Sequence, residues 1–252
     1  MRGLNEREDF FMGSILFVLL PALLAGLVQG ITGFGSGIVL MIFLPLQFSI
    51  LTSGAIAGVI GLVLCIAMVI RYRESINYKE IFYPAILFLL ATNAAVSYAK
   101  HLNADVMSLI LGLFLFGLSI YYLFFNKNQY KPNRMVSFIF IITSGIFNGL
   151  FNIGGPLMVI YFLSKIEDKE QYLGTIQAFF TVITIFSTFI RISNGLLSSN
   201  HLLPIGIGII GILTGLFFAN RIVDRLDTEN IQKLTYIVIG FSGIYNVIMA
   251  IT

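Results

Sequence analysis

Charged side chains are scarce in this chain. Asp, Glu, Lys and Arg together make up 11% of its 252 residues, against about 25% in an ordinary soluble domain. The few basic residues are spread over short polar segments and form no stripe, so the sequence predicts no nucleic-acid partner. Hydrophobic residues account for 58% of the chain, which predicts a protein of the lipid bilayer.

Cysteine and histidine are nearly absent as well. Cys65 is the single cysteine, which excludes an internal disulfide. The two histidines, His101 and His201, lie at the edges of apolar runs, where they cannot share membrane depth with a serine nucleophile such as Ser36. The sequence shows no cluster of metal ligands and no buried acid. We therefore expect a protein that is not an enzyme and that holds no cofactor or metal.

Apolar runs occupy nearly the whole chain. A transmembrane helix needs about 20 apolar residues. Runs of this length lie at 49–70, 80–99, 105–125, 171–190, 201–220 and 231–251. Two longer runs, 10–46 and 135–164, contain clusters of glycine. The predicted fold is all-α and polytopic, with one transmembrane domain over residues 1–252.

The glycine clusters stand where an unbroken helix would form most easily. The first, GLVQGITGFGSG at 26–37, holds five glycines together with Gln29, Thr32 and Ser36. The second, GIFNGLFNIGGP, begins at Gly145. Glycine and proline disfavour a helix by about 1 and about 3 kcal/mol relative to alanine. Each cluster therefore predicts a broken or re-entrant helix.

The two clusters belong to an internal repeat. A shift of 119 residues aligns their glycines: Gly26 with Gly145, Gly30 with Gly149 and Gly35 with Gly154. At a shift of 120, Arg71 aligns with Arg191. We predict a first repeat at 10–125, a linker at 126–134 and a second repeat at 135–251. The Gly-x-x-x-Gly spacing that opens each cluster also suits close helix packing, which is an alternative role for those four glycines.

Paired helix breaks in the two halves of a membrane protein point to a binding site. At membrane depth an unwound segment is tolerated where it is buried in protein or lines a polar cavity. Pro156 suits the first turn of a helix and Ser36 suits an N-cap, so a helix start is expected after each break. Helix N-termini attract anions. The candidate substrate-binding residues are Gln29, Thr32, Gly33, Gly35, Ser36, Asn148, Asn152, Gly154 and Gly155.

No charged residue is expected inside an apolar run. Arg71 and Arg191 stand at the edges of runs, where snorkelling to the interface explains them as well as steering of an anion does. Gln177, Thr181 and Asn93 are weaker candidates for the site, because hydrogen bonds between helices would account for them equally. A small anionic substrate is therefore expected to be held by neutral donors and helix ends, without a buried counter-charge.

The paired glycine motifs, each opening a half of roughly 120 residues, resemble those of the TauE/SafE family of sulfite and organosulfonate transporters. The chain departs from that pattern with GSG at 35–37 and GGP at 154–156, where a glycine triplet is frequent, and with Leu44, where proline is frequent. The resemblance implies a secondary transporter, a permease or exporter, of sulfite or an organosulfonate. We expect a multi-pass protein of the cell membrane, in a bacterial or archaeal inner membrane.

Two alternatives remain open from the residues alone. The same donors would hold a small carboxylate, and an anion channel would share the broken helices. The lack of an intramembrane carboxylate argues against an acidic proton relay, yet H⁺ or Na⁺ stays open as a coupling ion. The direction of transport, the choice between 8 and 10 crossings and the oligomeric state do not follow from the sequence.

The distribution of basic residues distinguishes two topologies. If each half crosses the membrane an odd number of times and the N-terminus is outside, 11 of the 15 Lys and Arg residues lie inside and 4 outside. Even halves with an internal N-terminus give 9 and 6. The positive-inside rule favours the first arrangement. We therefore predict an inverted repeat with both termini outside, in which a thiol at Asn128 is reached from the inside.

Overall fold

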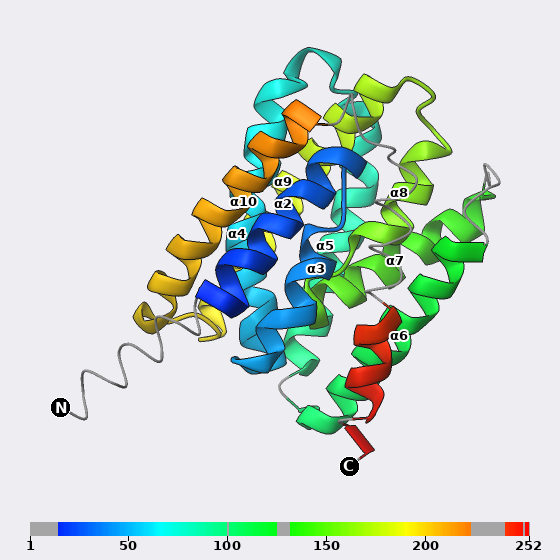
Figure 1. Ribbon diagram of the computed structural model, residues 1–252. Coiled ribbons are helices and arrows are strands. Elements are labelled where there is room, and N and C mark those ends of the chain that lie inside the picture. The colour runs from blue at the N-terminus through cyan, green and yellow to red at the C-terminus, as the bar shows by residue number, and fades with distance from the viewer. Residues whose placement is uncertain (1–14, 100, 125–131, 223–239, 249, 252) are drawn as a thin grey trace.

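The structure, a computed structural model, describes residues 15–99, 101–124, 132–222, 240–248 and 250–251 (Figure 1). All regular elements in these ranges are helical, which confirms the all-α class. Within the described residues, six helices are long and apolar enough to cross a membrane, which confirms a polytopic membrane protein. They are α4 (Ile50–Arg71), α5 (Lys79–Ala99), α6 (Ala104–Phe124), α7 (Arg134–Phe151), α9 (Lys169–Ser193) and α10 (Leu202–Ile222).

Two parts of the predicted organisation lie at the edge of the described chain. Most of the linker predicted at 126–134, including Asn128, lies outside the described residues. In the last predicted run, 231–251, the residues up to 239 also lie outside them, and 240–248 are helical. The boundaries of the two repeats thus stay predictions.

Each predicted break separates a helix from a short helix that follows it. α2 (Leu20–Thr32) is followed by α3 (Ser36–Phe43), and α7 by α8 (Gly155–Leu163). Figure 1 shows the chain reversing its direction between α2 and α3. With 8 and 9 residues, α3 and α8 are about 12–14 Å long, less than half of a hydrocarbon core of about 30 Å. Each short helix alone therefore reaches only part of the way across.

Shorter helical turns join these helices. They are η1 (Ile15–Leu19), η2 (Leu44–Leu46), η3 (Arg73–Ser75) and η4 (Ser199–His201). Phe48, just before α4, packs its ring against His201 at a centroid distance of 6.0 Å. This contact places the start of α4 beside the start of α10.

The first glycines of each cluster bring two helices into close contact. α2 packs along α10 and α7 along α5. A Cβ atom on Gly30 would lie 2.6 Å from the Cβ of Ala219, and one on Gly145 would lie 2.6 Å from the carbonyl oxygen of Phe88. Both distances are far below van der Waals contact. Close packing, the alternative role named above, therefore accounts for these positions.

The counterpart helices α4 and α9 cross the centre of the molecule in opposite directions. In the first half of α4, Gly58 lies beside Thr188 and Arg191 of α9. Beyond the end of α4, the backbone N–H of Asn77 donates to the hydroxyl of Thr175 at 2.9 Å. Corresponding helices of an inverted repeat run antiparallel. This geometry favours the inverted relation, which remains a prediction.

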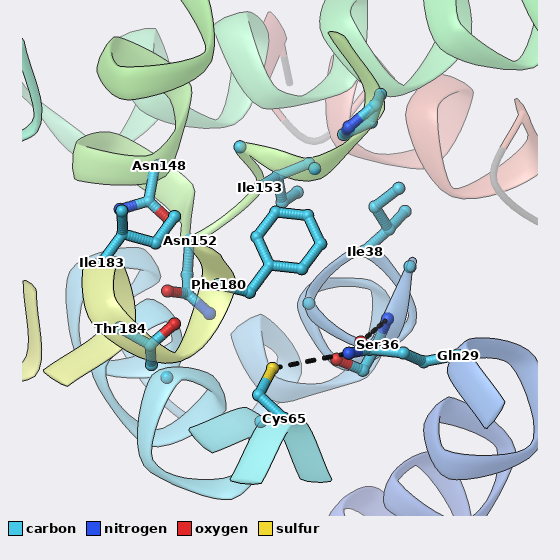
Figure 2. A pocket seen from close by; sticks show the side chains of 17 residues that line it. Gln29, Ser36, Ile38, Cys65, Asn148, Asn152, Ile153, Phe180, Ile183 and Thr184 are labelled. Atoms are coloured by element: carbon cyan, nitrogen blue, oxygen red, sulfur yellow. Dashed lines mark hydrogen bonds between the residues drawn. The ribbon is translucent and has the colours of Figure 1, made fainter. Parts of the chain in front are cut away.

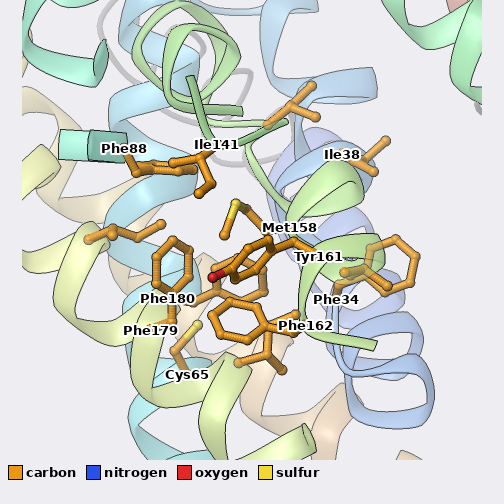
Figure 3. Close-up of a cluster of buried hydrophobic side chains, with 14 of the residues drawn as sticks. Phe34, Ile38, Cys65, Phe88, Ile141, Met158, Tyr161, Phe162, Phe179 and Phe180 are labelled. Atoms are coloured by element: carbon orange, nitrogen blue, oxygen red, sulfur yellow. The ribbon is translucent and has the colours of Figure 1, made fainter. Parts of the chain in front are cut away.

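Aromatic residues fill the core around the two short helices. Phe88, Phe162 and Phe179 are fully buried, and their rings meet edge to face at centroid distances of 5.2–5.4 Å (Figure 3). The outer surface is apolar as well: Leu90 is 64% exposed and Phe189 is 68% exposed. Exposed apolar side chains in such numbers match a lipid-facing surface.

The two ends of the molecule offer a test of the predicted topology. Glu74 in η3 and Asn200 in η4 are exposed and lie at opposite ends of α4 and α10. In a Cys65→Ser background, we expect a cysteine at Glu74 to react with a membrane-impermeant thiol reagent from the inside, and one at Asn200 to react from the outside. Labelling of intact cells and of inverted vesicles measures this. The reverse pattern would refute the predicted sidedness.

Candidate functional site

The two helix breaks meet at one cavity. Its volume is about 60 Å³, and its walls come from both breaks and from α4 and α9 (Figure 2). Seven of the nine residues predicted for the site line it: Gln29, Gly35, Ser36, Asn148, Asn152, Gly154 and Gly155. The other lining side chains are chiefly apolar, among them Ile38 and Phe180. Residues 119 positions apart in the sequence thus share one small space.

Thr32 and Gly33, the other two predicted residues, do not line this cavity. The Thr32 hydroxyl lies 2.9 Å from the carbonyl oxygen of Val28 and 2.8 Å from that of Phe34. Gly33 ends α2 in the left-handed conformation, with φ 83°, and its N–H donates to the carbonyl of Gln29 at 2.8 Å. Both residues shape the turn out of α2.

Gln29 and Gln177 close the first break. The Gln29 amide donates to the side-chain oxygen of Gln177 at 3.1 Å and accepts from the backbone N–H of Ser36 at 3.2 Å. The Gln177 amide in turn donates to the carbonyl of Gly33. The Sγ atom of Cys65 lies 3.5 Å from the Gln29 amide nitrogen. Gln177, a weaker candidate from the sequence, therefore belongs to this network.

Asn148 and Asn152 form the second break. Asn152 takes the left-handed conformation, with φ 59°, and its N–H donates to the carbonyl of Asn148 at 2.8 Å. Asparagine tolerates this conformation better than most residues. The Asn148 amide lies 3.4 Å from the hydroxyl of Thr92. The second break thus uses an asparagine where the first uses glycine.

Arg191 corrects the expectation that the site has no buried charge. Its side chain is 1% exposed, so it does not snorkel to the interface. The guanidinium donates to the carbonyls of Asn148 and Gly149 and, at 3.2 Å, to the side-chain oxygen of Asn152. Arg191 stands near the end of its apolar run, and nothing in the sequence showed that α9 would extend beyond it and bury it.

Both short helices begin at the cavity. α3 starts at Ser36, and its N-cap is Gly35 with φ 102°, so the predicted role of Ser36 as the N-cap is wrong. α8 starts at Gly155 after Gly154, and Pro156 lies in its first turn as expected. The first N–H groups of a helix lack acceptors within it and carry partial positive charge. Both ends therefore face the cavity with the sign that suits an anion.

A second, larger hollow lies at the far end of α4. Its volume is about 530 Å³, and it is lined by Gly30 from α2, by Arg71, and by Lys169 and Leu173 from α9. Arg71 is exposed there and donates to the side-chain oxygen of Asn220. Gly30 directly follows Gln29. The segment around the first break therefore borders both this vestibule and the cavity.

A family model described as sulfite exporter TauE/SafE matches residues 18–246. The chain belongs to the TauE/SafE family. This membership makes it a membrane transporter of sulfite or related anions. Searches of curated proteins and of solved structures found no match.

Gly35 and Gly154 are needed for different reasons, which a pair of alanine substitutions can show. Gly35→Ala places a side chain in the left-handed region, at a cost of about 1–2 kcal/mol. Gly154 has an ordinary φ of −96°, but an added Cβ would lie 2.5 Å from Cζ of Phe88. We expect Gly154→Ala to destabilise by about 1–3 kcal/mol through overpacking.

Double variants of the purified protein separate the two causes by thermal unfolding. Phe88→Leu shortens the side chain that clashes, so the double variant with Gly154→Ala should be more stable than the two single effects predict. Val28→Ala removes the nearest neighbour of Gly35 and should give Gly35→Ala no such recovery. Equal recovery in both pairs would contradict this distinction.

Proposed function

We propose that this TauE/SafE protein is a secondary transporter of a small sulfur oxyanion, sulfite or a compact organosulfonate, which binds in the cavity between the two breaks. One observation carries the proposal: Ser36 and Gly155, the first residues of the two short helices, line the same cavity. Two helix N-termini that converge on one space are suited to bind an anion.

The size of the cavity supports a compact ligand. A cavity needs about 10–15 Å³ to hold one water molecule, so a volume of about 60 Å³ holds four to six atoms of that size. Sulfite has four non-hydrogen atoms and fits such a space. An aromatic sulfonate does not fit without a change in the walls.

The charge around the cavity supports an anion. Arg191 lies behind Asn152 and Gly58, which both line the cavity. No Asp or Glu lines it among the residues that the structure describes. A metal cation or an organic amine would therefore meet positive ends on two sides and no carboxylate. A small carboxylate would use the same donors and remains the alternative substrate.

The surroundings of the cavity at its two ends, toward Arg71 and toward Arg191, support a carrier as opposed to a channel. At one end lies the vestibule at Arg71, and Gln29, which is hydrogen-bonded to Gln177, lines the cavity directly before Gly30 of the vestibule. At the other end Arg191 is buried and bonded to the backbone of α7. Access from one side at a time is typical of a secondary transporter, whereas a channel needs a continuous path.

Ligand binding tests the proposed substrate. Sulfite should raise the apparent melting temperature of the purified protein, since a ligand that binds only the folded state stabilises it by about 2.7 kcal/mol at 100 times its Kd. Thiosulfate, taurine, an aromatic sulfonate, acetate and chloride complete the panel. Ser36→Ala and Asn152→Gly should weaken the response while keeping the fold, because glycine accepts the left-handed conformation of residue 152.

The outcomes of this panel distinguish the proposals. A response to acetate that exceeds the response to sulfite would assign a carboxylate instead. Stabilisation by a divalent cation, with none by any anion, would refute the anion site. Steady sulfite current in a planar bilayer would indicate a channel, whereas slow and saturable uptake into proteoliposomes supports a carrier.

Cys65 provides a native probe of the cavity. Its Sγ atom lines the cavity and lies beside Gln29. Bromoethanesulfonate, which alkylates the thiol to a thioether that sulfite does not cleave, should modify Cys65 and abolish uptake of labelled sulfite, because the adduct fills the space. Cys65→Ser should transport normally and resist the reagent. Methanesulfonate, with five non-hydrogen atoms, is the protecting ligand of choice, since sulfite itself consumes the alkylating reagent. Full modification of Cys65 with unchanged uptake would show that the cavity is not on the route.

A further inference from the structure

Arg191 is a buried cation without a carboxylate partner among the residues that the structure describes. Its three hydrogen bonds go to the carbonyls of Asn148 and Gly149 and to the side chain of Asn152. The carbonyl end of α7 carries a partial negative charge and compensates the guanidinium only in part. A full charge in a protein interior is otherwise paired with an opposite charge.

Gly58 of α4 leaves a space between this guanidinium and the cavity. Gly58 and Asn152 both line the cavity. A methyl group on Gly58 would lie 3.7 Å from Nη1 of Arg191, 3.6 Å from Oγ1 of Thr188 and 3.4 Å from Oδ1 of Asn152. Three polar atoms from two elements therefore surround the place that the glycine leaves empty.

Thr188 adds an unused hydroxyl to this space. Its Oγ1 atom is buried and has no hydrogen-bond partner among the described residues, whereas buried polar atoms nearly always have one. Thr188 and Arg191 lie three residues apart on α9, hence on one face of the helix. The guanidinium has five N–H groups, so some of them remain unused after its three hydrogen bonds. Both side chains therefore have capacity for a further acceptor.

We propose that the space beside Gly58 is a second anion subsite, in which Arg191 binds the transported oxyanion directly and Thr188 donates to one of its oxygens. The subsite rests on the proposed function, because its ligand is the anion that enters the cavity. A sulfonate or sulfite group presents two oxygens at the spacing that the planar guanidinium matches. The anion takes the place of Asn152 Oδ1 on Nη1, which releases the Asn152 side chain toward the cavity.

Gly58→Ala tests the subsite without touching the arginine. The added methyl fits at ordinary contact distances of 3.4–3.7 Å, so the protein should fold, yet it fills the space that the oxyanion needs. We expect the Kd for sulfite, measured by thermal shift and by calorimetry on purified protein, to rise about tenfold or more. Gly54→Ala is the matched control on the same helix, since its methyl contacts the backbone of Phe151 and Asn152 at 3.4–3.6 Å and Gly54 does not line the cavity.

Two further variants address the donors. Thr188→Val keeps the shape and removes the hydroxyl, so the Kd should rise about 3-fold to 10-fold. Arg191→Gln should raise it by about 30-fold or more, and Arg191→Lys should fall between the wild type and Arg191→Gln, because lysine keeps the charge without the planar fork. If Arg191 only caps α7, then Thr188→Val and Gly58→Ala bind sulfite as the wild type does, and the subsite is refuted.

The experiment separates this proposal from the proposed function. Sulfite that stabilises the wild type and Gly58→Ala equally, but not Ser36→Ala, leaves the transporter assignment intact and refutes the subsite. A wild type that responds to no anion refutes the proposed function itself. Weaker binding in Gly58→Ala and Thr188→Val, with Gly54→Ala unchanged, supports the subsite.

Discussion

Backbone polar groups at membrane depth need partners within the protein, and the two helix breaks concentrate this requirement at the centre of the molecule. Helix α9 supplies hydrogen-bond donors to the backbone at both breaks. Gln177 donates to the carbonyl of Gly33 in the first break, and Arg191 donates to the carbonyls of Asn148 and Gly149 in the second. The two side chains lie about four helical turns apart, on nearly the same face. One rigid helix therefore fixes the separation of the two breaks and of the cavity walls between them.

The side chains that close the two breaks differ in charge, so the electrostatic potential differs between the two ends of the cavity. Gln29 and Gln177 close the first break with a hydrogen bond between neutral amide side chains. Breaking and re-forming this hydrogen bond costs little electrostatic energy. Arg191 closes the second with a full positive charge in a buried position. Because the local dielectric is low, the proposed anion would be drawn toward the second break more strongly than toward the first. The neutral closure is also the one next to the vestibule.

The sequence predicted the fold class and most of the candidate site from two signals: apolar runs of membrane length and glycine clusters within them. The first signal places five helices, α4, α5, α6, α9 and α10, within a few residues, because lipid enforces a minimum length. The second brings Gln29, Ser36, Asn148 and Asn152 to one cavity. The predicted repeat is what paired the two glycine clusters across a separation of 119 residues. Local helix propensity carries no information about such a distant contact.

Tertiary packing decided what the sequence could not. Arg191 stands near the end of an apolar run, and its burial depends on α9 extending past it to Ser193 beside the second break. Gly58 looks like one of several small residues on α4, and only the neighbouring helix gives it a role. Thr32 has the right chemistry for a ligand but bonds to its own turn. Such outcomes depend on which helix faces which, and periodicity alone does not set that.

The unequal states of Arg71 and Arg191 follow from the same packing. Under the predicted repeat, aligned residues should have equivalent surroundings, yet Arg71 is exposed at a vestibule while Arg191 is buried against the carbonyl end of α7. Under an inverted relation, exchanging the two environments would open the opposite end of the route and close this one. The exchange requires Arg71 to reach the carbonyl end of α2, and Gly30, at that end, already lines the vestibule with it. Under the proposed carrier function, this structural asymmetry between the two breaks would allow one site to be presented to two sides.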